Sequence, residues 1–248
     1  MTTHFDVLAT DYDGTIATHG VVDDATLAAL RRVRHAGVKL VLVSGRERES
    51  LARTFAHFEI FDLMVLENGA TLYDPATQNE LPLCDPPRVD FVTALRDANV
   101  HPLSVGNVIV ATVEPHEIVV LETIRALGLE YQVIFNKGAV MVLPPGVNKA
   151  SGLKRGLAYL GLAAERAVAV GDAENDHALL ELAGIGAAVS NALQSLKDRA
   201  DFVATRDHGA GVAELIEAML AGNLARRPRM MRESPRELGD HVDVHPVD

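Results

Sequence analysis

Short apolar segments alternate with amphipathic segments along most of the chain, and several apolar segments stop abruptly at a polar cluster. Such nearly continuous apolar runs are typical of strands buried on both faces of a parallel sheet. We predict strands over residues 5–10, 38–43, 63–66, 108–113, 131–135, 139–143, 167–170, 185–189 and 202–204. Helical spacing of apolar residues predicts helices over about 24–36, 44–57, 89–98, 116–127, 149–160, 176–183 and 212–220. This alternation predicts an α/β fold with a doubly wound parallel sheet, helices covering both of its faces.

Prolines interrupt the alternation at two places and indicate two linkers. Residues 81–87 contain three prolines, and residues 144–146 read Pro-Pro-Gly. The segment between them has a length at the small end of the range for domains. We therefore expect a core formed by residues 1–83 and 146–224, with a small α/β domain inserted at residues 84–145.

The last residues, 225–248, differ from the rest because apolar periodicity ends there. Five arginines lie between Arg226 and Arg236, and an acidic stretch follows. We expect a disordered tail or a linker; a basic segment that binds a partner is the alternative.

The composition narrows the classes of partner. The formal net charge is −11, which disfavours nucleic acid and anionic membranes as partners. It also repels phosphorylated substrates, so a site for them must supply its own positive charge. The single cysteine, Cys84, cannot form an internal disulfide, and no Cys/His cluster has zinc spacing. The N-terminus does not resemble a signal peptide, and the apolar runs are too short to span a bilayer, so we expect a cytoplasmic protein.

Polar clusters stand where several predicted parallel strands end. Asp11, Ser44 and Asp172 each follow directly after an apolar run. In open parallel sheets, ligands bind outside the carboxyl ends of the strands. We therefore expect these three residues to converge on one crevice, although they lie far apart in the sequence.

The first cluster, Asp11-Tyr12-Asp13-Gly14-Thr15, places two carboxylates at a strand end that runs into a glycine turn. Two such carboxylates can take different roles if their environments separate their pKa values. One stays ionised and can attack phosphorus, whereas the other can hold a proton for the leaving oxygen. A bare Asp-x-Asp is more often a pair of caps or turn residues, and the apolar strand before it favours the catalytic interpretation here.

The other clusters supply groups that suit a phosphate and a metal ion. Ser44-Gly45-Arg46, at a predicted helix start, can form an anion site. Lys149, at the start of another helix, could neutralise a phosphoryl group. Residues 171–176, Gly-Asp-Ala-Glu-Asn-Asp, are rich in oxygen ligands, and Mg²⁺ prefers carboxylates together with substrate phosphate.

Taken in order, these clusters resemble the four motifs of the haloacid dehalogenase-like hydrolase superfamily: Asp11-Tyr12-Asp13-Gly14-Thr15, Ser44-Gly45-Arg46, Lys149 and Gly171-Asp172-x-x-Asn175-Asp176. Two further segments resemble its Cof-type (subfamily IIB) phosphatases: Glu67-Asn68-Gly69-Ala70 and Asn148-Lys149-x-x-Gly152-Leu153. The resemblance covers about residues 5–220. It implies a Rossmann-like core and, between the second and third motifs, an α/β cap of type C2, where the insert at 84–145 lies.

The resemblance also implies roles at the matching positions. Asp11 would be the nucleophile and a metal ligand, and Asp13 the general acid/base, with its backbone carbonyl on the metal. The phosphoryl group would be bound by Ser44, Gly45, Arg46, Lys149 and Asn175. Asp172 would ligate Mg²⁺ directly, and Asp176 would ligate it or orient its waters.

The function expected from these roles is a Mg²⁺-dependent phosphatase that acts on a small phosphorylated metabolite through an aspartyl-phosphate. The substrate would resemble a sugar phosphate or phosphoglycolate. Two alternatives stay open: a phosphomutase, which would need a second phosphate site in the cap, and a ligand-sensing domain linked to a partner by the Arg-rich tail. The only cationic side chains that we find in the cap for a second site are Arg88, Arg96, Arg125 and Lys137. The sequence does not predict the oligomeric state.

Overall fold

The computed structural model describes residues 5–136 and 138–225. The expected tail, and with it the alternative of a basic partner-binding segment, therefore lies outside the described residues from residue 226 onward. Among the residues that are described, no helix combines the length and apolar character needed to cross a membrane.

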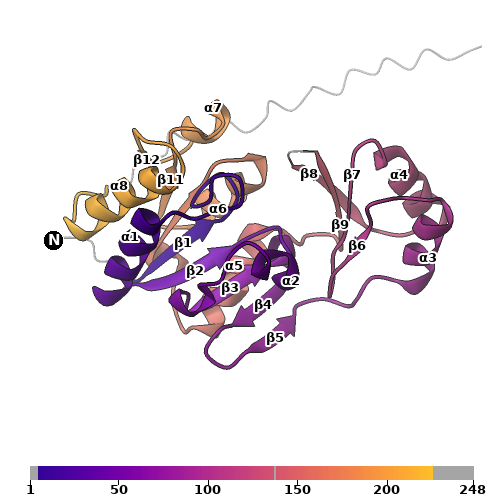
Figure 1. Ribbon diagram of the computed structural model, residues 1–248, viewed down its shortest axis with the longest axis horizontal. Coiled ribbons are helices and arrows are strands. Elements are labelled where there is room, and N and C mark those ends of the chain that lie inside the picture. Colours follow the sequence, from indigo (N-terminus) through magenta and orange to yellow (C-terminus); the bar gives the residue numbers. More distant parts are fainter. Residues whose placement is uncertain (1–4, 137, 226–248) are drawn as a thin grey trace, which may run out of the picture.

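The larger sheet has eight strands in the order β12-β11-β10-β1-β2-β3-β4-β5 (Figure 1). The strands from β12 to β3 pair in parallel, and β4 and β5 add antiparallel pairs at one edge. Their bounds are β1 (Val7–Asp11), β2 (Lys39–Val43), β3 (Leu63–Leu66), β4 (Thr71–Asp74), β5 (Asn79–Pro82), β10 (Ala167–Gly171), β11 (Ile185–Ala188) and β12 (Phe202–Val203).

Helices cover both faces of this sheet because its strands are apolar on both sides. On one face, α1 (Asp24–His35) and α8 (His208–Leu220) pack over alternate strand residues such as Leu8 and Leu40. On the other face, α5 (Lys149–Tyr159) and α6 (His177–Leu182) pack over the intervening residues, such as Val7 and Val41. The expected doubly wound α/β fold is confirmed.

A second, four-stranded antiparallel sheet lies beside the first, in the order β6-β7-β9-β8 (Figure 1). Its strands are β6 (Ser104–Val105), β7 (Val110–Val113), β8 (Gln132–Asn136) and β9 (Ala139–Leu143). Helices α3 (Val89–Asp97) and α4 (Glu117–Ala126) cover one face through a cluster around Phe91 and Val142. The opposite face contributes Met141 to an apolar cluster that includes Ala70, next to β4. The boundaries of the inserted domain, residues 84–145, remain a proposal.

Two local predictions were wrong. Residues 81–82 belong to edge strand β5 instead of a linker, and an edge is where a sheet tolerates proline. The helix predicted over 44–57 is only α2 (Arg48–Ala52), so Ser44-Gly45-Arg46 forms a loop before the helix. This loop is held by β3 and by the turn after it: Ser44 N donates to Val65 O in β3 at 2.8 Å, and Ser44 O accepts from Asn68 N in the turn at 3.0 Å. The backbone N–H and C=O of Ser44 are therefore not available for hydrogen bonds within a helix.

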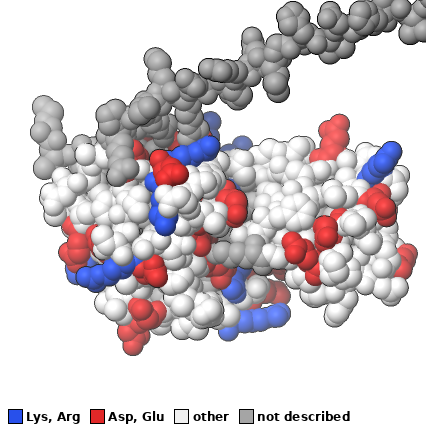
Figure 2. Space-filling view, turned by 90° about the horizontal axis from the view of Figure 1, so that it is seen from above, with Lys and Arg blue, Asp and Glu red and all other residues white. Residues whose placement is uncertain are grey.

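Acidic and basic side chains are interspersed on the face shown in Figure 2, with acidic ones the more frequent. This distribution agrees with the net charge of −11. Any positive charge that serves the predicted site must therefore be local.

Candidate active site

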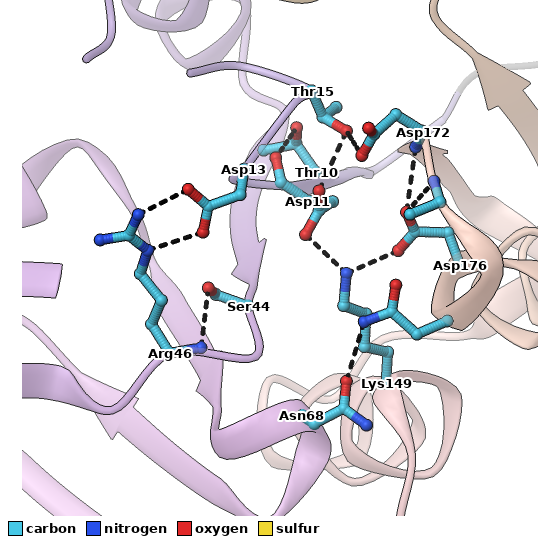
Figure 3. A network of polar contacts seen from close by, with 12 residues as sticks. Thr10, Asp11, Asp13, Thr15, Ser44, Arg46, Asn68, Lys149, Asp172 and Asp176 are labelled. Carbon is cyan, nitrogen blue, oxygen red and sulfur yellow. Dashed lines mark hydrogen bonds and ion pairs between the residues drawn. The ribbon is translucent and has the colours of Figure 1, made fainter. Parts of the chain in front are cut away.

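The polar clusters predicted to converge do so at the carboxyl ends of neighbouring strands. β1 lies between β2 and β10, with parallel pairing on both sides. Asp11 ends β1, Ser44 follows β2, and Asp172 follows β10. Lys149 reaches the same place from the start of α5 (Figure 3). The strand order therefore explains why residues so distant in sequence share one site.

Three buried carboxylates form the centre of the site. Asp11, Asp172 and Asp176 present oxygen atoms that lie within 4.8 Å of one another. The Thr15 hydroxyl joins two of them, at 3.1 Å from Asp11 Oδ2 and 3.2 Å from Asp172 Oδ1 (Figure 3). Carboxylate oxygens are hard ligands of the kind that Mg²⁺ takes, so the donor set fits a divalent cation.

Lys149 brings the positive charge that this acidic site requires. Its ammonium Nζ lies 2.6 Å from Asp11 Oδ1 and 2.7 Å from Asp176 Oδ1, with the side chain only 2% exposed. Asn148 caps α5 in a reciprocal capping box with Ser151, and this fixes Lys149 in the first turn. Burial lowers the pKa of Lys149, but the two carboxylates outweigh burial, so its pKa is raised and the group stays protonated.

Asp11 is not an ordinary carboxylate in this environment. Burial, the largest cause, and the nearby charges of Asp176 and Asp172 raise the pKa of Asp11 to about 7, although Lys149 acts to lower it. Three buried carboxylates face one buried ammonium, so negative charge is in excess. A divalent cation would balance that excess, which is the physical argument that the site suits a metal.

Asp176 organises the loop after β10. Its Oδ2 accepts hydrogen bonds from the backbone N–H groups of Asp172 and Ala173, both at 3.0 Å. Its Oδ1 accepts from Lys149. The turn is tight: a Cβ added at Gly171 would lie 2.4 Å from Asp176 Cγ. Glycine at that position therefore lets the carboxylate fold back under the loop.

Asp13 lies apart from the three-carboxylate cluster and contacts Arg46. The guanidinium binds both carboxylate oxygens, Nε to Oδ2 and a terminal nitrogen to Oδ1, each at 2.6 Å (Figure 3). Asp13 is about one third exposed, whereas Asp11 is buried. The two carboxylates of the Asp-x-Asp pair thus have different environments. Arg46, expected on the phosphoryl group, here binds the carboxylate of Asp13.

The remaining predicted phosphate ligands line the same region. Ser44 is buried, and its Oγ accepts from the backbone N–H of Arg46 at 3.2 Å. Asn175 donates from its side-chain amide to Asn68 Oδ1 at 3.1 Å. The free ends of this amide pair, Asn175 Oδ1 and Asn68 Nδ2, are buried and have no hydrogen-bond partner in the described structure. Such orphaned polar atoms beside a site are compatible with a ligand that binds there.

Sequence reasoning gave no role to three residues that the structure places in or beside the site. Thr15 contacts two of the carboxylates, Asn68 holds Asn175, and the carboxylate of Glu67 binds the inserted domain. The polar run Glu67-Asn68-Gly69 after β3 was the available signal, but its partners lie 40 and 107 residues away in sequence.

Comparisons with known proteins agree with this geometry. The family of haloacid dehalogenase-like hydrolases matches residues 8–95 and 96–216. A "Phosphoglycolate phosphatase 2" of Saccharolobus solfataricus is 28% identical over 229 residues, which cover 89% of this chain and 94% of that protein. A "Phosphoglycolate phosphatase" of Methanothermobacter thermautotrophicus is 29% identical over 220 residues, which cover 86% and 98%.

Two solved structures share the fold. A HAD/Cof-like hydrolase from Plasmodium vivax superposes with a TM-score of 0.74 at 18% identity, covering 88% of this chain and 96% of that one. A sugar phosphatase of HAD subclass IIB superposes with a TM-score of 0.67 at 18% identity, covering 89% and 100%. The chain belongs to the haloacid dehalogenase-like hydrolase family, as its four motifs predicted, and it has the fold of the Cof-type members.

Proposed function

We propose that this chain is a Mg²⁺-dependent phosphatase that hydrolyses a small phosphorylated metabolite with Asp11 as nucleophile. Hydrolysis of a phosphoric monoester is the reaction class that the family and the names of the relatives support. The observation that carries the proposal is the buried group of Asp11, Lys149, Asp172 and Asp176 at the ends of β1 and β10.

Mg²⁺ would be held by Asp11 and Asp172, with the backbone carbonyl of Asp13. When bound, the ion supplies positive charge for the phosphoryl oxygens and for the transition state. Both oxygens of Asp176 already accept hydrogen bonds from the protein, and this supports a role in orienting the site beside any direct contact with the metal.

The reaction gives the two carboxylates of the Asp-x-Asp pair the roles that the family resemblance implies. An Asp11 oxygen attacks phosphorus in line, and the bond between phosphorus and the ester oxygen breaks while Asp13 gives that oxygen a proton. Asp13 then takes a proton from a water molecule, which attacks the phosphorus of the aspartyl-phosphate and frees Asp11. Lys149, Ser44 and Asn175 contact the phosphoryl oxygens. Asp13 accepts from Arg46 through both oxygens, so one of these oxygens must leave Arg46 and take up a proton before Asp13 can act as the acid.

The substrate class rests on the relatives. Two of them are named phosphoglycolate phosphatases, and a structural neighbour is named a sugar phosphatase. We infer a small phosphorylated acid or sugar as substrate. Its non-phosphate part would lie between the phosphate site and the inserted sheet.

The experiment is a screen of the full chain against phosphorylated metabolites, with and without Mg²⁺. We expect release of inorganic phosphate that requires Mg²⁺, and loss of this activity in Asp11→Asn. Asp6→Asn is the matched control, because Asp6 precedes the same strand at its opposite end and pairs with Arg166. An isomerised sugar phosphate without free phosphate would indicate a phosphomutase instead. Tight binding without turnover would indicate a ligand sensor.

A further inference from the structure

Glu67 is a buried carboxylate outside the four motifs, and the hydrogen-bond donors to its side chain lie in the inserted domain. The side chain is 1% exposed. Its Oε1 accepts from the backbone N–H of Asn107 at 2.9 Å, and its Oε2 accepts from those of Val108 and Ile109 at 2.8 and 2.9 Å. Three backbone donors converging on one carboxylate form an anchor of defined geometry, since an ionised carboxylate only accepts hydrogen bonds.

The inserted domain is shaped to receive this carboxylate. A Cβ added at Gly106 would lie 2.8 Å from both Cδ and Oε2 of Glu67. Only glycine at this position allows the turn 106–109 to approach so closely. Just beyond it, Val108 and Ile109 join the apolar cluster that contains Ala70, which follows the Glu67 turn in the core. The contact therefore lies where water is excluded, and there hydrogen bonds to a charge are strong.

On the core side, Glu67 belongs to a strained turn. Glu67, Asn68 and Gly69 have φ of 51°, 55° and 105°, and two consecutive non-glycine residues in this region are unfavourable. The turn is held by contacts in several directions. Glu67 N donates to Arg46 O at 3.0 Å, and a Cβ at Gly69 would lie 2.0 Å from Asn148 O.

The same turn contacts the proposed phosphate ligands. Asn68 N donates to Ser44 O at 3.0 Å, and Asn68 Oδ1 accepts from Asn175 at 3.1 Å. Lys149 directly follows the Asn148 backbone on which Gly69 packs. The three residues of this turn thus contact both regions: Asn68 and Gly69 contact residues around the phosphate site, and Glu67 contacts the inserted turn.

The inserted sheet lies directly over the loop of the second motif. Met141 Sδ, on β9, would be 3.5 Å from a Cβ at Gly45. A small displacement of this sheet would therefore change the space available beyond the phosphoryl group. Glu67 shares the contact between this sheet and the core with two more exposed carboxylates: Glu47 accepts from Ser104 Oγ at 2.6 Å, and Glu80 accepts from the Asn107 side chain at 3.0 Å.

We propose that Glu67 is a positioning residue, which fixes the inserted turn 106–109 relative to the phosphate site and so sets the space for the non-phosphate part of the substrate. This inference rests on the proposed phosphatase function. It assigns Glu67 no contact with the reacting atoms. Glu67 should therefore matter for esters, whose leaving group extends toward the inserted sheet, more than for inorganic phosphate, which needs only the core.

The test is Glu67→Gln in the full chain with Mg²⁺. The substitution keeps the shape but turns one acceptor oxygen into an amide donor that faces backbone N–H groups. We expect kcat/KM for p-nitrophenyl phosphate to fall about 10- to 100-fold, the range expected when a buried charge-assisted hydrogen bond is broken. The inhibition constant of inorganic phosphate should stay near that of the unmodified protein. Equal losses for both ligands, or no loss for either, would overturn the proposal.

Two further variants separate positioning from a general loss of structure. Gly106→Ala disturbs the same contact from the inserted side, so it should give the same selective loss, and the double variant should be no worse than either single one. Glu80→Gln is the control for loss of a carboxylate charge beside the same turn. In this turn Glu80 accepts only from the Asn107 side chain, at 3.0 Å, where glutamine can still accept, and its other oxygen pairs with Arg48 in the core at 2.9 Å. Additive losses, or an equal loss in Glu80→Gln, would count against the proposal.

Amide hydrogen exchange gives a readout that does not depend on catalysis. In Glu67→Gln, the amides of Asn107, Val108 and Ile109 should exchange faster, while those of β1 keep their protection. Unchanged protection of these three amides would refute the anchor even if activity falls. If the unmodified chain hydrolyses no phosphate ester, the proposed function fails, but the exchange result still decides whether Glu67 holds the turn.

Discussion

Replacing Lys149 with methionine would remove the buried positive charge of the site and preserve most of its volume. The ammonium is 2% exposed and contacts Asp11 and Asp176 at 2.6 and 2.7 Å. Without it, buried carboxylates lack their cationic partner. Removing one partner of a buried ion pair typically costs about 3–5 kcal/mol of unfolding free energy, and we expect a loss of this size in metal-free Lys149→Met.

The loss should depend on pH and on metal. The pKa of Asp11 is already about 7 with the lysine present, and without the lysine it should be higher. Protonation of Asp11 then relieves the repulsion at acidic pH, so the loss should be largest at alkaline pH and smaller near pH 5. Mg²⁺ at about 100 times its dissociation constant should restore about 2.7 kcal/mol, because it binds only the folded state.

The assay is urea unfolding followed by circular dichroism, in EDTA and in Mg²⁺, at acidic and alkaline pH. Lys154→Met, on the exposed side of the same helix, is the control and should change stability by no more than about 0.5 kcal/mol. A destabilisation of Lys149→Met that is equal at both pH values and insensitive to Mg²⁺ would refute the electrostatic reasoning. It would mean that Lys149 acts by packing alone.

Three further outcomes follow from the site. Asp13→Asn should lower kcat about 10²- to 10⁴-fold on an alkyl phosphate and less on p-nitrophenyl phosphate, whose leaving group needs less protonation; equal losses would contradict a general acid. Chelation by EDTA should stop turnover, and added Mg²⁺ should restore it. Asp172→Asn should need a higher Mg²⁺ concentration for half-maximal activity. Full activity in EDTA would show that turnover does not require a metal ion. For the metal-free protein, the folded state binds more protons than the unfolded state between the ordinary pKa of Asp11, 3.8, and about 7. Its unfolding free energy should therefore fall by up to about 4 kcal/mol as pH rises through this window, and urea titrations of Asp11→Asn should lack that part of the fall. A rise in the same window would show the opposite sign of the shift.

The sequence predicted the core of the site because strand ends in a parallel sheet meet at one edge. Asp11, Ser44 and Asp172 each follow an apolar run, and the neighbouring positions of β1, β2 and β10 bring them together. Apolar runs without alternation, such as the one around Leu40, also predicted a sheet buried on both faces, and this was confirmed.

Features that depend on distant partners could not be predicted in the same way. The loop at Ser44 was predicted as helix because its sequence is compatible with one, but hydrogen bonds to Val65 and Asn68 hold it in a non-helical bend. Glu67 looks like an ordinary turn residue until the backbone donors at 107–109 are placed against it. The hairpin β4–β5 was missed because it is short and its second strand ends at Pro82.

The most direct test of the central claim is to trap the phosphorylated enzyme. The full chain is mixed with Mg²⁺ and a substrate found in the screen, quenched in acid within one turnover, and digested for mass spectrometry. Our account predicts one added phosphoryl group on the peptide that contains Asp11, and none in Asp11→Asn. Rapid release of phosphate with no phosphoryl group on Asp11, or with the group on another residue, would contradict it.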